Sequence, residues 1–292
     1  MQKVIALLKM GRPNILSGGI LAYCLGAAMG YWQAGTMNWR LFGLGLLITE
    51  ITNLVAHYAD EYADVDTDSL TRRTVFSGGS GVLPAGLLTP AWAIGAALTF
   101  AILCASLTAW AVLSGSLPTH VGWIVGIGLV GGWFYSMPPL SLERRGMGEV
   151  DNALLGGIFM PLMGYTVQTG QPDWQACLAL LPFFFIVMAG LLGAHWPDRA
   201  ADAAVGRRSL TYRLGDRAPL AHKLFIALAY GLTLLLAGRV LPGPVVAAIF
   251  LSLPASLWAA LAYGRQESPV PSSLAMAIFI AAGTAGWVFA AS

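Results

Sequence analysis

The chain has 292 residues, of which 57% are apolar and only 10% are charged. A soluble domain carries about 25% charged residues, so this sequence has too few charges to cover a water-exposed surface, and it is too apolar for a disordered chain. The 16 Lys and Arg residues and 14 Asp and Glu residues leave a net charge of +2, which argues against a nucleic-acid-binding protein. Three cysteines lie in apolar runs, and their spacing fits neither a metal site nor a disulfide framework.

Membrane-spanning helices are predicted along the whole chain. A helix of about 20 mostly apolar residues crosses a bilayer, and the sequence has about nine such stretches, the seventh and eighth being separated by the tight turn 241–244. We therefore expect an all-α integral membrane protein, with about nine transmembrane helices in one bundle and a single domain over residues 1–292. The stretches are 14–32, 40–60, 89–113, 120–137, 151–167, 176–195, 222–241, 243–263 and 272–290.

The basic residues are distributed unevenly between the two ends of these stretches. All but two of the 16 Lys and Arg residues lie at the N-terminus or in the loops after the second, fourth, sixth and eighth stretches; the exceptions are Arg40 and Arg239. Because basic residues mark the cytoplasmic side of a membrane protein, we expect a cytoplasmic N-terminus and an external C-terminus. Two of the cytoplasmic loops, 61–88 and 196–221, are long, and long loops in compact proteins are usually functional.

Two runs of aspartates follow the second and sixth stretches. The first contains Asp60, Asp64 and Asp68, and the second contains Asp198 and Asp202. Residues four apart share one helical face, where like charges repel each other. An acid at bilayer depth also costs about 2.5–3.5 kcal/mol on insertion scales. Clusters of this kind therefore indicate that a cation binds there, with inert, solvated loop charges as the alternative interpretation.

The cation expected at these runs is Mg²⁺. It prefers oxygen ligands and is held by one or two carboxylates together with substrate phosphates, whereas the His and Cys spacing of a zinc site is absent. Glu61 borders the first run, while Asp66 and Asp151 are expected to be solvated. Arginine pairs follow the runs at 72–73 and 207–208, and the guanidinium fork suits phosphate oxygens. The runs thus predict carboxylates for metal ions and arginines for a diphosphate.

Several segments, in the same order, resemble the UbiA superfamily of intramembrane prenyltransferases. The family's first motif, Asn-Asp-x-x-Asp-x-x-x-Asp, is matched by residues 60–68, and its second, Asp-x-x-x-Asp, by residues 198–202. Residues 206–210 resemble the Gly-Lys-x-Thr-Leu that follows the second motif. Residues 135–149 resemble the Tyr-x-x-Pro-Pro loop after helix 4, and Arg12-Pro13 resembles the Arg-Pro that opens helix 1.

The resemblance covers about residues 10–290 and implies a nine-helix enzyme. Its expected reaction is the Mg²⁺-dependent transfer of a prenyl group from an isoprenyl diphosphate to an aromatic acceptor. The residues around the first motif, 57–58 and 76–84, are most similar to the branch that prenylates 1,4-dihydroxy-2-naphthoate in menaquinone synthesis. The expected partners are therefore an isoprenyl diphosphate, a lipid-soluble or amphipathic aromatic acceptor and membrane lipid, but no nucleic acid. The expected location is the inner (cytoplasmic) membrane, with the active site on the cytoplasmic side.

The resemblance also implies roles for individual residues. Asp64, Asp68, Asp198 and Asp202 are expected to be catalytic and to hold metal ions together with Asp60 and Glu61. The diphosphate is expected to contact Arg72, Arg73, Arg207 and Tyr135. Acceptor binding or stabilisation of an allylic cation is expected from Arg12, Asn53, His57, Tyr58, Tyr62, His195 and Trp196. Aromatic faces stabilise desolvated cations by about 2 kcal/mol, although Tyr and Trp also anchor helices at membrane interfaces.

The chain departs from the family pattern at three positions. Asp60 stands for Asn, Glu61 for Asp, and Arg207 for Lys. Each replacement keeps an oxygen ligand or a positive charge, although Arg presents its donors differently from Lys. We therefore expect metal and diphosphate binding to persist, while the catalytic rate or the choice of acceptor changes.

Other functions fit parts of the pattern. The same fold acts on other acceptors, such as 4-hydroxybenzoate, a chlorophyllide, a haem or a glycerol phosphate. A cation-coupled transporter also uses intramembrane acids, but here the acids gather at helix ends and no pair of broken helices is visible in the sequence. A non-catalytic protein that binds a prenyl diphosphate is the third alternative, and Asp60 and Glu61 are the residues that favour it.

Overall fold

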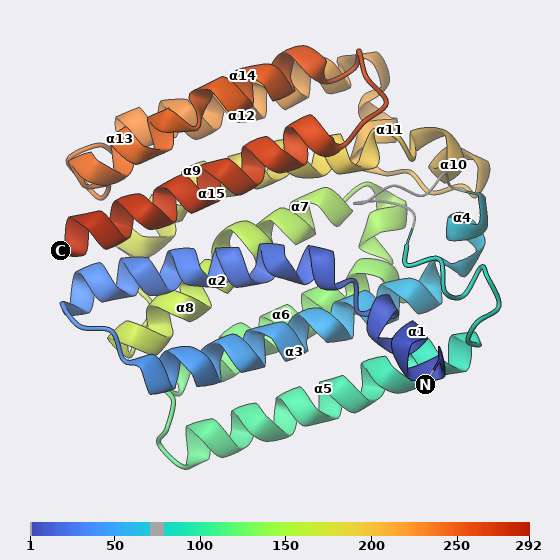
Figure 1. Cartoon of the computed structure of the whole chain (residues 1–292), viewed down its shortest axis with the longest axis horizontal. Helices are drawn as coiled ribbons and strands as arrows, with labels where there is room; N and C mark the ends of the chain where they lie inside the picture. Colours follow the sequence, from blue (N-terminus) through green and yellow to red (C-terminus); the bar gives the residue numbers. More distant parts are fainter. Residues whose placement is uncertain (1, 71–78) are drawn as a thin grey trace.

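The computed structural model describes residues 2–70 and 79–292. The regular secondary structure of these residues is helical, and the connecting segments contain only isolated β-bridges (Figure 1). The all-α expectation is confirmed. The α-helices are α1 Gln2–Met10, α2 Pro13–Ala34, α3 Trp39–Ala63, α4 Val65–Leu70, α5 Pro90–Leu113, α6 His120–Ser136, α7 Gly148–Leu154, α8 Met160–Thr169, α9 Trp174–His195, α10 Arg199–Ala204, α11 Leu210–Leu214, α12 Ala218–Leu235, α13 Gly243–Leu251, α14 Leu253–Ala262 and α15 Val270–Ala291. The shorter helical turns are η1 Leu142–Arg145, η2 Leu155–Phe159 and η3 Gly215–Arg217.

Local sequence signals explain where the long helices begin and end. Pro13 opens α2, where its missing N–H costs nothing, and Gly35 ends it with a φ of 70°. The Asn38 side chain accepts a hydrogen bond from the Leu41 N–H at the start of α3, and the Asp173 side chain does the same for Gln175 at the start of α9. These caps fix the ends that face away from the acidic runs.

Six helical segments of the described chain are long and apolar enough to cross a membrane. A seventh is possible if α13 and α14, which meet at an angle of 42°, form one broken span. The remaining two predicted stretches are also helical: 120–137 is α6, which has 17 residues, and 151–167 runs through α7, η2 and α8. The structure thus gives an integral membrane bundle of six to seven candidate spans by length and composition.

The outside of the bundle is apolar in the way that lipid requires. Leu113 is 87% exposed, Leu251 is 81% exposed and Ile102 is 68% exposed. Exposed apolar side chains on this scale suit hydrocarbon, in which backbone polar groups must be satisfied within helices.

Small residues let α2 and α8 pack backbone against backbone. A Cβ atom at Gly26 would lie 1.5 Å from the Pro161 carbonyl oxygen, and one at Gly164 would lie 2.3 Å from the Tyr23 carbonyl oxygen. Glycine is therefore required at both positions, as at other close crossings between transmembrane helices. This contact joins the first span to the middle of the chain.

The polar elements collect at one end of the bundle. Figure 1 shows α1, α4, α10 and α11 at the end that holds the N-terminus, with the C-terminus at the opposite end. The two acidic runs, which are more than 100 residues apart in sequence, therefore lie at the same end.

A π-helical turn, η2, joins α7 to α8. It spans Leu155–Phe159, and a Cβ atom at Gly157 within it would come 2.8 Å from the Phe184 Cα of α9. The wider turn and the glycine allow this segment to lie directly against α9.

We predict that Gly26→Ala destabilises the protein by at least about 3 kcal/mol, the upper end of the usual overpacking cost, because the new methyl group would overlap the Pro161 backbone. The measurement is thermal unfolding in detergent. The matched control is Gly43→Ala in α3, where a Cβ atom meets nothing within 4 Å. Equal stability of the two variants would contradict the proposed close contact.

Candidate active site

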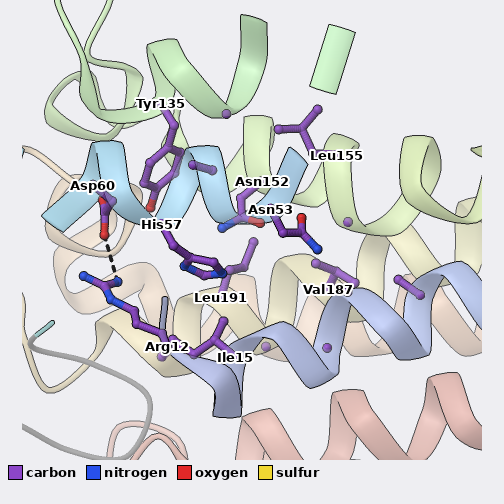
Figure 2. Close-up of a pocket in the computed structure, with 18 of the residues that line it drawn as sticks. Arg12, Ile15, Asn53, His57, Asp60, Tyr135, Asn152, Leu155, Val187 and Leu191 are labelled. Carbon is purple, nitrogen blue, oxygen red and sulfur yellow. Dashed lines mark ion pairs between the residues drawn. The ribbon is translucent and has the colours of Figure 1, made fainter. Parts of the chain in front are cut away.

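A cavity of about 580 Å³ lies among α2, α3, α6, α7, α9 and α15 (Figure 2). One end reaches the acidic runs and is polar. Further along the same helices the walls become apolar, with Leu21, Val125, Met163, Val187 and Ile280 among the lining residues. The cavity therefore offers charged groups at its mouth and an apolar interior behind them.

The first acidic run crosses a break between two helices. α3 ends at Ala63 and α4 starts at Val65, with Asp64 between them. The hydrogen-bond spacing nevertheless persists, because Asp64 N–H donates to the Asp60 carbonyl over 2.9 Å and Asp68 N–H donates to the Asp64 carbonyl over 2.8 Å. All three aspartates line the cavity, so the predicted shared face is retained.

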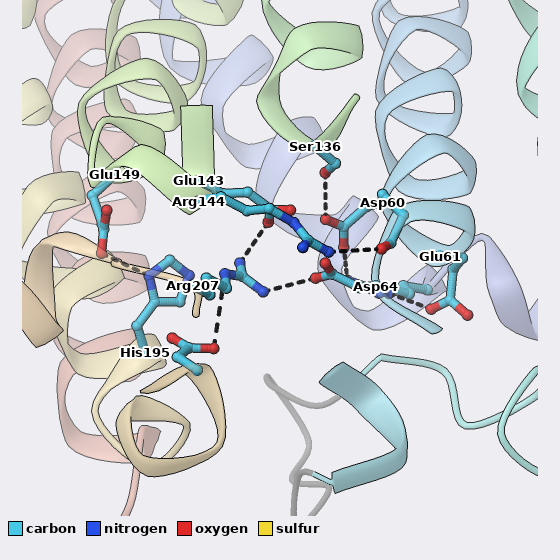
Figure 3. A network of polar contacts seen from close by, with 12 residues as sticks. Asp60, Glu61, Asp64, Ser136, Glu143, Arg144, Glu149, His195 and Arg207 are labelled. Atoms are coloured by element: carbon cyan, nitrogen blue, oxygen red, sulfur yellow. Dashed lines mark hydrogen bonds and ion pairs between the residues drawn. The ribbon is translucent and has the colours of Figure 1, made fainter. Parts of the chain in front are cut away.

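Arg12 holds the start of α2 against the end of α3. Its guanidinium lies 2.8 Å from Asp60 Oδ2 and 2.7 Å from Glu61 Oε1 (Figure 3). Its φ of 49° places the backbone in the left-handed region, which is uncommon for a residue with a side chain. The ion pairs fix this strained link between α1 and α2, and they place Arg12 inside the acidic end of the cavity.

Glu61 connects α3 to the segment that follows α4. Its carboxylate accepts hydrogen bonds from Ser80 N–H at 2.6 Å and from Ser80 Oγ at 2.5 Å, in addition to pairing with Arg12. Next to Ser80, a Cβ atom at Gly79 would lie 1.8 Å from Asp68 Oδ2. The structure thus places Glu61 at a junction of three segments, beside the other acids but outside the cavity lining.

Arg207 joins the two acidic runs. Its Nη1 lies 2.7 Å from Asp64 Oδ2, its Nη2 lies 2.5 Å from Glu143 Oε2, and its Nε lies 3.8 Å from Asp202 Oδ1 (Figure 3). Its own backbone N–H donates to the Asp202 carbonyl over 2.8 Å, which ties the arginine to the end of α10. Asp198, at the start of α10, lines the same cavity. Aspartates of both runs and Arg207 thus line one cavity.

Glu143 is a member of the site that sequence reasoning missed. It lies in η1, is 1% exposed, and brings a carboxylate oxygen to within 4.8 Å of oxygens of Asp60 and Asp64. Asp64 Oδ1 and Glu143 Oε1 are both buried and accept no hydrogen bond from the described residues. Such an all-oxygen set with free buried lone pairs fits a hard divalent cation such as Mg²⁺. The 135–149 segment contains two acids, Glu143 and Glu149, and their spacing of six residues marks neither of them as a metal ligand.

His195 is positioned by a second missed acid, Glu149. Glu149 Oε1 lies 3.0 Å from His195 Nδ1 and accepts hydrogen bonds from the Leu210 and Thr211 N–H groups at 2.9 and 3.4 Å. These bonds lower the pKa of the Glu149 carboxyl to about 2, although its burial acts in the opposite direction. Glu149 therefore stays ionised and fixes the end of α9 to the start of α11, with His195 in the cavity wall.

Burial changes the acidity of the other carboxyl groups at the polar end. Burial raises the pKa of Asp64 and raises that of Glu143 well above its usual value, although the neighbouring Arg207 opposes both shifts. The pKa of Asp68 is raised to about 8, again by burial and against the field of Arg12. A bound cation would oppose these upward shifts, because it would stabilise the ionised carboxylates.

The two arginines remain charged. Burial alone would lower their pKa values, but the adjacent carboxylates outweigh it and raise the pKa of both Arg12 and Arg207. The adjacent carboxylates thus stabilise the charged form of both buried guanidiniums.

The remaining expected site residues divide into two groups. Asn53, His57 and Tyr135 line the cavity (Figure 2). Three other aromatic residues lie outside the described cavity lining. Tyr58 stacks on Phe100 and donates to the Leu7 carbonyl over 2.8 Å, Tyr62 is 40% exposed, and Trp196 packs on Tyr263 and Arg199.

Asp66 and Asp151, both expected to be solvated, differ in their surroundings. Asp66 is exposed, as expected for a solvated acid. Asp151 is not solvated as expected, because it lines the cavity and its Oδ2 is buried. Arg72 and Arg73, together with residues 76–78 of the segment after the first run, lie outside the described residues.

The site thus combines charged groups with an apolar cavity inside a membrane bundle. Comparison with known proteins gives the family: residues 20–290 match the UbiA prenyltransferase family, and the chain belongs to it. It is therefore a transferase of prenyl groups, as the motifs predicted.

Individual relatives agree with this assignment. The chain is 26% identical over 282 residues to 1,4-dihydroxy-2-naphthoate octaprenyltransferase of Bacillus subtilis (strain 168), covering 92% of this chain and 85% of that protein. Its fold is similar to that of a UbiA homolog from Archaeoglobus fulgidus bound to DMAPP and Mg²⁺, with a TM-score of 0.68 at 19% identity over 96% of this chain and 98% of the other. It is also similar to digeranylgeranylglyceryl phosphate synthase, with a TM-score of 0.68 at 15% identity over 99% of this chain and 100% of the other.

We predict that Arg12→Ala lowers stability by about 3 kcal/mol, because it leaves two largely buried carboxylates without their cation. Thermal unfolding in detergent measures the effect. Arg199→Ala is the matched control, since it breaks an ion pair with Glu267 whose side chains are 34% and 63% exposed, and such pairs contribute about 1 kcal/mol or less. A loss no larger than that of the control would show that Arg12 does not hold the acidic end together.

Proposed function

We propose that this protein transfers a prenyl group from an isoprenyl diphosphate to an aromatic acceptor in the membrane, with Mg²⁺ as cofactor and 1,4-dihydroxy-2-naphthoate as acceptor. The observation that carries the proposal is the convergence of both acidic runs and Arg207 on the mouth of one apolar cavity. The name of the Bacillus subtilis relative supports the acceptor. The diphosphate and Mg²⁺ described for the Archaeoglobus fulgidus homolog support the donor and the cofactor.

In this proposal the acids at the cavity mouth hold the metal ions. The ligands would be drawn from Asp60, Glu61, Asp64, Asp68, Asp198 and Asp202. Bound Mg²⁺ would neutralise the diphosphate and favour its departure as a leaving group. Arg207 and Tyr135 would bind the diphosphate oxygens, as would Arg72 and Arg73. Since Arg207 now contacts Asp64 and Glu143, its donors are already gathered where the anionic head would lie.

The cavity walls would direct the reaction. The carbon–oxygen bond to the diphosphate breaks, a carbon–carbon bond to the acceptor ring forms, and the ring loses a proton, or carbon dioxide in the case of a naphthoate. Tyr135, whose ring lines the cavity beside the acids, would stabilise the allylic cation. Asn53, His57 and His195 would orient the acceptor by hydrogen bonds, and the apolar walls would hold the prenyl chain away from water.

We also propose about nine membrane crossings with a cytoplasmic N-terminus and a single domain over residues 1–292. The clustering of basic residues on one side supports the cytoplasmic N-terminus. The termini lie at opposite ends of the bundle, which supports an odd number of crossings (Figure 1). The active site would then face the cytoplasm from the inner membrane.

The test is an assay of the purified protein with Mg²⁺, geranylgeranyl diphosphate and a panel of acceptors headed by 1,4-dihydroxy-2-naphthoate, with products identified by mass spectrometry. We expect a prenylated naphthoate from the wild type. Asp64→Ala should lower the rate by at least about a hundredfold, because it removes a buried acid of the cavity mouth. Asp66→Ala, an exposed acid of the same run, should retain activity.

Product from another member of the panel, including a glycerol phosphate, would keep the transferase and replace the acceptor. If no acceptor in the panel gives product, the proposed reaction is overturned.

We further predict that divalent cations bind more tightly as the pH rises from 6 to 8. The raised pKa of Asp68, about 8, means that a proton must leave before this carboxyl binds a cation. Affinity should therefore rise by up to about tenfold per pH unit below 8, and binding of Mn²⁺ in the absence of diphosphate measures it. Asp68→Asn should reduce this dependence, and a pH-independent affinity in the wild type would exclude Asp68 as a ligand.

A further inference from the structure

Glu143 is a buried acid in neither of the two aspartate runs. It belongs to η1, between α6 and α7, and is 1% exposed. A carboxylate this deep in a protein needs a partner of opposite charge or a set of hydrogen-bond donors. Its one described ion pair is to Arg207 Nη2 at 2.5 Å, and its Oε1 accepts no hydrogen bond from the described residues. One oxygen of the Glu143 carboxylate therefore pairs with Arg207, and the other lacks a hydrogen-bond donor among the described residues.

The unused oxygen belongs to a three-membered group. Oxygens of Asp60, Asp64 and Glu143 lie within 4.8 Å of one another, and they come from the last turn of α3, the α3–α4 junction and η1. Asp64 is 4% exposed and its Oδ1 is also without a hydrogen bond from the described residues. Two buried carboxyl groups from separate segments thus face each other, and either a shared proton or a cation must lie between them.

The charges around this group do not balance. Five carboxylates, those of Asp60, Glu61, Asp64, Glu143 and Asp202, contact Arg12 and Arg207 in the described part of the chain. If all five were ionised, the two guanidiniums would leave three negative charges, in a region where most of these side chains are buried. A divalent cation is the group that removes most of this excess and uses oxygen ligands.

We propose that Asp60, Asp64 and Glu143 form a divalent-cation site that fills before any prenyl diphosphate binds. This inference concerns the same cavity mouth as the proposed function and rests on that function for its role in the reaction. Glu143 is the member that makes it distinct, because it brings the α6–α7 loop to the metal as a third segment. A cation here would also share Asp64 and Glu143 with Arg207, so it would weaken the ion pairs of Arg207 and free its guanidinium for an anionic substrate.

The alternative role for Glu143 is that of a counter-ion that only positions Arg207. The two roles predict different effects on metal binding. If Glu143 is a ligand, its amide analogue should bind cations poorly, and removal of Arg207 should strengthen binding because a competing positive charge is lost. If Glu143 only positions Arg207, its amide analogue should not lower the affinity for a cation when no diphosphate is present.

The experiment measures Mn²⁺ binding to the purified full-length protein in detergent, by the loss of the free-ion signal in electron paramagnetic resonance, without diphosphate. We expect saturable binding to the wild type, at least tenfold weaker binding to Glu143→Gln, partial recovery in Glu143→Asp, and tighter binding to Arg207→Gln. The matched control is Glu149→Gln, which changes a second acid of the same loop that is also 1% exposed but is bonded to His195 and Leu210. Circular dichroism and thermal unfolding identify any variant that fails to fold, and Glu143→Asp and Arg207→Gln then carry the test.

Several results would overturn the proposal. They are the absence of Mn²⁺ binding without diphosphate, an unchanged affinity in Glu143→Gln, or an equal loss in Glu143→Gln and Glu149→Gln. The outcome is independent of turnover. Mn²⁺ binding that depends on Glu143 in a protein that prenylates no acceptor would sustain this site and reject the proposed function. Turnover by a protein that binds no Mn²⁺ in the absence of diphosphate would reject this site and support the proposed function.

Discussion

The structure depends on holding several carboxylates together at one end of an apolar bundle. Asp60, Asp64 and Glu143 repel one another, and burial adds a desolvation cost for each charge. Arg12 and Arg207 offset part of this cost, and each does so by joining segments that are far apart in the sequence. The ion pairs of Arg12 seat α2 on α3, and those of Arg207 draw the loop after α10 to α3 and η1. The ion pairs that balance these charges therefore hold this end of the fold together, and the same side chains form the site.

The same arrangement explains how one cavity serves two unlike parts of a substrate. The charged end needs solvated, acid-rich segments, while the interior needs close-packed helices with apolar faces. The close contact of α2 with α8 at Gly26 and Gly164 keeps the wall tight where no polar group is present. The polar end is built instead from short helices such as α4 and α10, whose breaks let side chains from several directions meet.

Much of this could be predicted from the sequence, for reasons that lie in particular residues. The apolar stretches and the spacing of Asp60, Asp64, Asp198 and Asp202 depend on local periodicity, which a single sequence displays. Contacts between distant segments do not depend on local periodicity, so a single sequence does not reveal them. Nothing local marks Glu143 or Glu149 as partners of Arg207 and His195, since those pairs form only when loops meet. The contacts of Tyr58 with Leu7 and of Trp196 with Tyr263 are likewise between separate segments, which sequence proximity does not reveal.

α7, η2 and α8 form one continuous helical segment. The π-helical turn η2 sets how far the side chains of α8 are rotated about the helix axis relative to those of α7. Its wider winding holds one residue more than an α-helical turn would, and each residue of an α-helix advances by about 100°. Asn152, before the turn, faces the cavity, while Gly164, after it, faces the backbone of α2. If the same residues were wound as a regular α-helix, the extra residue would rotate α8 by about 100° and bring a side chain next to Gly164 against α2. The wider turn thus sets the rotation at which α8 lines the cavity with Met163 and packs Gly164 against the backbone of α2.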